Sequence, residues 1–196
     1  MPHGRPSWPP NEVKFLARYL LKNKVGVQSI KLVESILTEA NLPSGRVLLV
    51  LNDGPIINGA LANCIPRMLL PYSKDFLLPD FEEDWDCGIS ISKIICDIYE
   101  EFPAFFTFVL GHELGHAYTC LQSVELHILC CLIEGKIGDA SSGKISKYHE
   151  MPYEIAYDRF GIYLTEKLFS REQWLEEMKA IQKRDIYDIE KWNNDI

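Results

Sequence analysis

The sequence lacks a long apolar run. No segment approaches the ~20 consecutive apolar residues that a membrane-spanning helix requires. The N-terminal stretch Met1–Pro6 also lacks the apolar core of a secretory signal. We therefore expect a cytoplasmic protein with no membrane partner.

The sequence also lacks a dense block of Lys and Arg, and its formal net charge is −8. Surfaces that bind nucleic acids directly normally carry basic clusters, so no direct nucleic-acid partner is expected. Acidic residues gather at positions 80–86. We interpret them as a solvated loop; the alternative is a cluster that attracts cationic substrates near a cleft.

None of the six cysteines forms a C-x-x-C pair, which argues against a structural zinc finger. In a chain without a secretory signal they are expected to be reduced thiols that pack in the core. They are Cys64, Cys87, Cys96, Cys120, Cys130 and Cys131.

The chain has 196 residues, 47% of them hydrophobic, which fits one globular domain with a full core. We expect an irregular Pro-rich arm over residues 1–10, the main domain over 11–170 and a C-terminal helical extension over 171–196. A capping box at Ser170–Gln173 predicts the start of the last helix. That helix is expected to dock on the core; the alternatives are a partner contact and a position across a cleft.

The strongest motif is His112-Glu113-Leu114-Gly115-His116. Two histidines four residues apart lie on one face of a helix, one turn apart, so both imidazoles can reach one Zn²⁺. Glu113 can then hold a water that the metal activates. Apolar residues flank the motif on both sides of the helix, which predicts a buried central helix. Burying two unpartnered imidazoles is costly, so the burial itself favours a metal.

The best candidate for a third ligand lies downstream. Pro152 suits the first turn of a helix, and Glu154 and Asp158 then lie one turn apart on one face. Glu154 can bind the metal, while Asp158 can accept a hydrogen bond from the other ring nitrogen of a ligating histidine. The alternative is an ordinary solvated acidic face.

These two patterns, the second ending in Phe160-Gly161, resemble the gluzincin clan of zinc metallopeptidases. The closer resemblance, over residues 88–168, is to small intracellular gluzincins, including regulatory peptidases that act on phage and stress-response repressors. The resemblance implies a Zn²⁺ cofactor, a peptide or protein substrate, His112, His116 and Glu154 as ligands, and Glu113 as base. These relatives often carry Ala where this chain has Tyr157.

The rest of the chain predicts a mixture of helices and strands. Helices are expected at Asn11–Leu21 and Gln28–Ala40, a pair with too few basic residues for a DNA-binding helix-turn-helix. A buried strand is expected at Arg46–Leu51. The alternation in Gly88–Ile94 predicts a half-exposed edge strand, which either receives an extended peptide or binds nothing. Short extended pieces are expected at Cys64–Leu70 and Asp75–Leu78.

Beyond the motif, Leu126–Ile133 is expected to be helical. His127 in this segment is interpreted as a packed core residue rather than a ligand. Residues 135–147 are predicted to be a loop, either a lid or a simple connection. Acyl-transfer sites need a donor for the oxyanion, and the candidates are His149, Tyr153 and Tyr157.

Together these patterns predict an α+β, zincin-like fold with a small mixed sheet, the metal helix packed on it and a helical lower half. The expected activity is zinc-dependent peptide hydrolysis with Glu113 as general base. Two alternatives belong to other classes. One is a catalytically silent zinc-binding module. The other is a regulator that acts on a repressor protein through the N-terminal helices.

Overall fold

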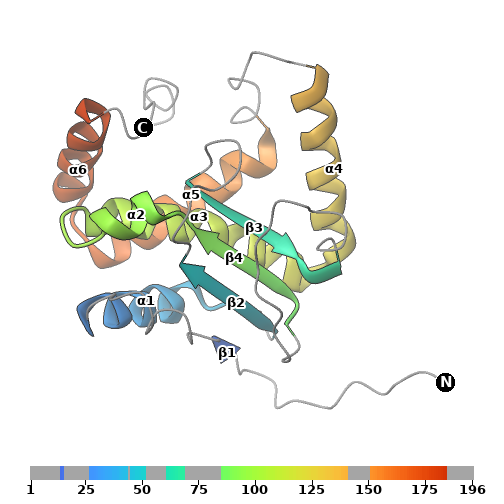
Figure 1. The fold of residues 1–196 in the computed structure, drawn as a ribbon, viewed down its shortest axis with the longest axis horizontal. Coiled ribbons are helices and arrows are strands. Elements are labelled where there is room, and N and C mark those ends of the chain that lie inside the picture. The colour runs from blue at the N-terminus through green and yellow to red at the C-terminus, as the bar shows by residue number, and fades with distance from the viewer. Residues whose placement is uncertain are drawn as a thin grey trace.

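A computed structural model describes residues 14–15, 27–43, 45–51, 61–68, 85–140 and 151–184. Over these residues the chain is α+β and mostly helical, with six helices and four strands (Figure 1). None of the helices in these ranges combines the length and the apolar character needed to cross a bilayer.

The four strands form one small mixed sheet, as the sequence predicted. They are β1 (Lys14–Phe15), β2 (Arg46–Leu51), β3 (Ala62–Pro66) and β4 (Cys87–Ile91), in the spatial order β1-β2-β4-β3. β1, β2 and β4 run parallel, whereas β3 pairs antiparallel with β4. β3 therefore lies at an edge of the sheet, where Pro66 at its last position is tolerated.

The prediction of a half-exposed edge strand at Gly88–Ile94 is wrong. β4 lies between β2 and β3, all five of its residues are buried, and the chain turns into the helix α2 (Lys93–Ile98) two residues later. Ser90 and Ser92 are buried although their side chains are polar. They fit into the core because they are small, so their polarity does not mean that water reaches this strand. In β4, alternation of apolar and small polar residues therefore does not indicate a solvent-exposed face.

The helix predicted at Asn11–Leu21 is contradicted at Lys14–Phe15, which form β1. Lys14 pairs with Arg46 and Phe15 with Val47. Backbone pairing with β2 overrides the helical periodicity of this segment, as long-range contacts often do. The following prediction is confirmed: the helix α1 (Val27–Ala40) has Val33 and Ile36 buried and ends at Asn41, whose φ of 44° is a left-handed C-terminal conformation.

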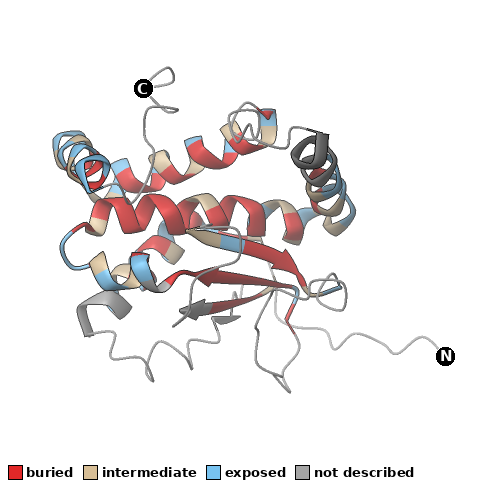
Figure 2. Cartoon of the chain, turned by 45° about the horizontal axis from the view of Figure 1, so that its top comes forward, coloured by how far each residue is buried: buried red, intermediate tan, exposed pale blue. Residues whose placement is uncertain are grey.

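The helix α3 (Pro103–Gln122) carries the histidine motif and lies at the centre of the fold. Its residues 104–111 are all buried, and Figure 2 shows most of the helix coloured as buried. α3 packs on β3 and β4 of the sheet on one side and on the helix α5 (Pro152–Leu168) on another. The predicted buried central helix, packed on a small sheet, is confirmed.

The last helix, α6 (Arg171–Lys183), starts where the capping box predicted, with Ser170 Oγ accepting a hydrogen bond from Gln173 N at 3.2 Å. Its predicted apolar stripe, Trp174, Met178 and Ile181, is buried in the same core as α3. The buried Glu177 of α6 accepts a hydrogen bond from Phe105 N at 2.9 Å, so it satisfies a free N–H of the first turn of α3. α6 thus anchors the start of the helix that carries the site.

The predicted loop at residues 135–147 is wrong for its first part, because the helix α4 runs from Val124 to Ala140. Gly135 and Gly138 do not end it, since a glycine within a helix costs only about 1 kcal/mol. Residues 141–147, the arm 1–10, the piece 75–78, His149 and the end of the C-terminal extension lie outside the described residues.

Candidate metal centre

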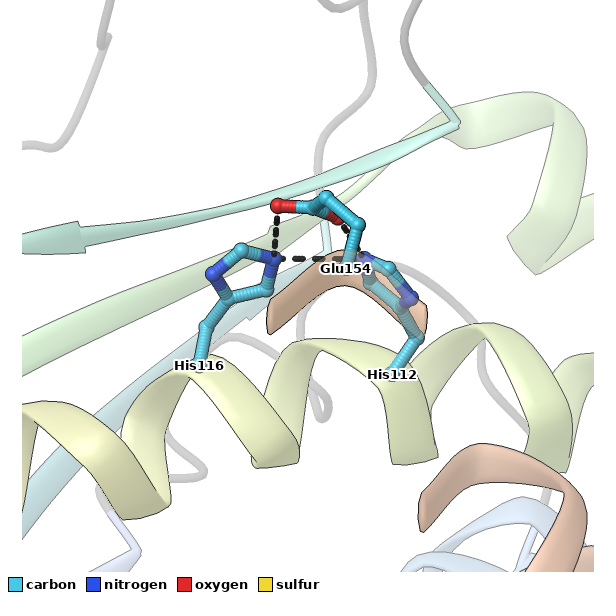
Figure 3. Close-up of side chains that lie close together, drawn as sticks. All are labelled: His112, His116 and Glu154. Atoms are coloured by element: carbon cyan, nitrogen blue, oxygen red, sulfur yellow. Dashed lines mark hydrogen bonds and ion pairs between the residues drawn. The ribbon is translucent and has the colours of Figure 1, made fainter. Parts of the chain in front are cut away.

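Three side chains predicted as ligands converge on one point. His112 and His116 come from successive turns of α3, and Glu154 comes from the first turn of α5 (Figure 3). The two Nε2 atoms are 3.2 Å apart. Glu154 Oε2 lies 3.3 Å from His112 Nε2, and Glu154 Oε1 lies 3.6 Å from His116 Nε2. The three residues form a group that could hold a metal ion.

The spacing of these donor atoms fits a tetrahedral metal. Ligands about 2.1 Å from such an ion lie about 3.4 Å from one another. The Glu154 side chain is fully buried, and among the described residues its oxygens have no hydrogen bond of good geometry beyond their ion-pair contacts with the two imidazoles. Such a carboxylate is expensive to bury without strong partners. The donor set therefore fits a divalent cation, which would satisfy both oxygens and both nitrogens.

Asp158 lies where the sequence predicted, one turn after Glu154 on α5. Its Oδ1 is 2.6 Å from His112 Nδ1, and its side chain is buried. This contact holds the proton on Nδ1 and turns Nε2 toward the ligand group.

Protonation of the site follows from these contacts. Burial lowers the pKa of His112, but its contacts with the carboxylates of Asp158 and Glu154 outweigh burial and raise it to about 10. Burial raises the pKa of Glu154, but its contacts with His112 and His116 outweigh burial and lower it to about 2. Burial lowers the pKa of His116. Without a metal, the site at neutral pH therefore holds one imidazolium, on His112, beside an ionised Glu154.

This proton predicts how zinc affinity depends on pH. A ligating imidazole must be neutral, so zinc has to displace the His112 proton wherever the pH is below about 10. Apparent zinc affinity should rise about tenfold per pH unit between pH 7 and 9, and calorimetry at pH 8 should show about one proton released. In Asp158→Asn, which loses a charge that raises the pKa of His112, the slope should flatten. A wild-type affinity that does not change over this range would contradict the assignment.

Glu113, the predicted base, is buried beside the ligands. Its charge contributes to the raised pKa of His112. It also adds to the effect of burial in raising the pKa of Cys64 on β3. The charge of Glu113 therefore acts both on the histidine group and on the edge strand β3.

The tyrosines predicted as candidate donors have other hydroxyl partners. Tyr157 donates a hydrogen bond to Thr119 Oγ1 at 3.0 Å, and Tyr153 donates to the Cys130 carbonyl at 3.3 Å. The Tyr157 ring instead packs on His116, with ring centroids 4.1 Å apart. A Cβ on Gly115 would lie 2.9 Å from Tyr157 Cδ1, so Gly115 makes room for this ring. Tyr157 thereby fixes the orientation of His116.

Glycines set the distance between the two helices of the site, a feature that the sequence analysis missed. A Cβ on Gly161 of α5 would lie 2.7 Å from Phe108 O and 3.1 Å from His112 N. A Cβ on Gly111 would lie 2.8 Å from Gly161 Cα. The helix backbones touch here, and this brings Glu154 and Asp158 within reach of His112. The four-residue spacing of Gly111 and Gly115 on one helix face was the available signal.

Gly161→Ala is expected to destabilise the protein, although helix propensity alone predicts a gain of about 1 kcal/mol. The added methyl group must push α5 away from α3, at a cost of about 1–3 kcal/mol for an overpacked core. The shift also moves Glu154, so zinc affinity should fall. Urea unfolding and a chelator competition assay measure the two effects. An unchanged or raised stability would show that the backbones are not in contact.

Five of the six cysteines lie in or at the edge of the core, as expected of packing thiols, and all six are free. Cys120, one turn past His116, points to the sheet, where contact with Cys87 and burial raise its pKa. A thiol of this kind is inert.

His127, interpreted from the sequence as a packed core residue, is indeed fully buried on α4. Its ring stands edge-on to His116, with centroids 5.6 Å apart and planes at 87°. The sequence analysis did not place it beside the ligands.

Comparisons with protein-family models, with curated proteins and with solved structures find no match to this chain. The structure itself shows two imidazoles and one carboxylate that are grouped closely enough to hold a metal ion.

Proposed function

We propose that this protein is a zinc metallopeptidase of the gluzincin type, with a zincin-like fold, that hydrolyses peptide bonds in peptide or protein substrates. The observation that carries the proposal is the convergence of His112, His116 and the fully buried carboxylate of Glu154, with Glu113 buried one residue after the first histidine. Zinc hydrolases use three protein ligands and leave a fourth position open.

The residues of the chain have distinct tasks in this reaction. Zn²⁺, when bound, supplies an activated water and polarises the scissile carbonyl. Glu113 takes the proton of the attacking water and later passes it to the leaving amine. Asp158 holds the tautomer of His112, and Tyr157 holds the ring of His116. Burial of the site strengthens each of these charge interactions.

The donor set alone does not select the metal, since two histidines and one carboxylate also hold Fe(II) in non-haem oxygenases. Glu113 favours zinc and hydrolysis, because a base beside the first histidine serves the activation of water and has no part in the binding of oxygen. Metal analysis of the protein purified without added metals tests this choice directly.

The proposal is tested with zinc-loaded protein and a broad mixture of peptides. Mass spectrometry should detect new peptide termini that appear with the zinc-loaded protein, disappear after chelation and return when zinc is restored. A protein with a full zinc complement that cleaves nothing in such a mixture would instead support the catalytically silent zinc-binding module.

A further inference from the structure

His127 lies beside His116 because of a sharp turn between two helices. α3 ends at Gln122 and α4 begins at Val124, so Ser123 alone separates them. Ser123 has an extended backbone and accepts a hydrogen bond from Leu126 N at 3.2 Å, which caps α4. The first turn of α4 therefore starts beside the end of α3, and His127 packs against His116.

The contact of His127 with Cys131 is compatible with a proton on Nδ1 of the imidazole. Nε2 lies 3.7 Å from Sγ of Cys131, one turn later on α4. The Cys131 thiol can donate its S–H weakly to Nε2, which is then the acceptor. A neutral imidazole then carries its single proton on Nδ1. The buried Nδ1 has no hydrogen-bond partner among the described residues.

A buried N–H without an acceptor is rare and costs stability unless a ligand supplies the acceptor. The proposed reaction creates a negatively charged oxygen that needs a hydrogen-bond donor. When water adds to the scissile carbonyl, a C–O bond forms, the C=O π bond breaks and negative charge collects on the carbonyl oxygen. The water proton goes to Glu113, and the C–N bond then breaks as that proton passes to the amine. The hydroxyls of Tyr153 and Tyr157 already donate elsewhere.

We propose that Nδ1–H of His127 donates a hydrogen bond to this oxyanion, so that His127 is a catalytic residue. The inference rests on the proposed hydrolysis at the site formed by His112, His116 and Glu154. It assigns the donor to α4, the helix that follows the motif helix. His127 is thereby distinct from the metal ligands, because it does not belong to the group of converging donor atoms.

Binding of small anions to cobalt-substituted protein tests this assignment without a substrate. Visible absorption of Co²⁺ reports the binding of methylphosphonate, a tetrahedral oxyanion, and of thiocyanate, a linear anion that has no oxygen to accept a hydrogen bond. His127→Phe keeps an aromatic ring against His116 but removes both nitrogens, and His127→Gln restores an N–H. His127→Phe should bind methylphosphonate about 10- to 100-fold more weakly, the usual effect of losing a hydrogen bond to a charged group. Thiocyanate binding and cobalt content should not change, and His127→Gln should recover part of the loss.

Two results would overturn the assignment of His127. Unchanged methylphosphonate binding in His127→Phe means that the imidazole donates to nothing at the site. Equal weakening of both anions, or loss of cobalt, means that His127 supports or ligates the metal. His127→Leu replaces His127→Phe if the latter does not fold. If wild-type protein binds no cobalt, the proposed function itself fails, and the assignment with it.

Discussion

Glu113→Gln is expected to reduce kcat for peptide hydrolysis about 10²- to 10⁴-fold, the usual contribution of a general base, while zinc content stays at about one ion per chain. Glutamine has the shape of glutamate but cannot take the proton of the attacking water. Glu113 is not among the converging donor atoms, so the metal affinity should survive the substitution.

The matched control is Glu166→Gln, which makes the same chemical change at an exposed position of α5. It should leave both kcat and zinc content at the wild-type values. If Glu113→Gln retains full activity, the hydrolytic mechanism is wrong even if zinc binds. If it loses zinc, the residue has a structural role that the described contacts do not account for.

Glu154→Ala is expected to weaken zinc binding by more than about 100-fold, because losing a ligand should exceed the 10- to 100-fold effect of losing an outer hydrogen-bond partner. The substitution also removes the buried carboxylate beside His116 and leaves His112 with Asp158 alone. Zinc should raise the thermal midpoint of the wild-type protein, since a ligand that binds only the folded state at 100 times its Kd adds about 2.7 kcal/mol. In Glu154→Ala, zinc should leave the thermal midpoint nearly unchanged.

Asp158→Asn tests the residue that orients the ligand His112 without removing any ligand. It keeps the three donor groups but weakens the contact that orients His112, so zinc affinity should fall about 10- to 100-fold. The graded series of wild type, Asp158→Asn and Glu154→Ala is measured by competition with a chelator of known affinity. An Asp158→Asn variant that binds zinc as weakly as Glu154→Ala would show that the two carboxylates are assigned the wrong way round.

The sequence predicted the members of the His112, His116 and Glu154 group because helix geometry decides which side chains share a face within each helix. His112 and His116 share a face at any four-residue spacing on a helix, and Pro152 sets the start of the helix that carries Glu154 and Asp158. That the helix of the histidines packs against the helix of Glu154 does not follow from either pattern. The expected burial of the histidines favoured this contact. Local pattern and tertiary structure agree at these positions.

The remaining features depend on contacts between distant segments. Whether β4 is central depends on β2 and β3 pairing on either side of it, which the alternation of Gly88–Ile94 does not encode. Lys14–Phe15 become a strand only because Arg46–Val47 lie beside them. The position of His127 depends on the single residue Ser123 between two helices. The close approach at Gly161 becomes visible only when α3 and α5 are placed together.

The most direct test of the central claim is X-ray absorption at the zinc K edge of the zinc-loaded protein. The proposed site predicts a first shell of nitrogen and oxygen only, at about 2.0–2.2 Å, with the outer-shell scattering of two imidazoles. Sulfur neighbours at about 2.3 Å would place the ion among the cysteines instead, and a protein that binds no zinc would remove the basis of the proposal.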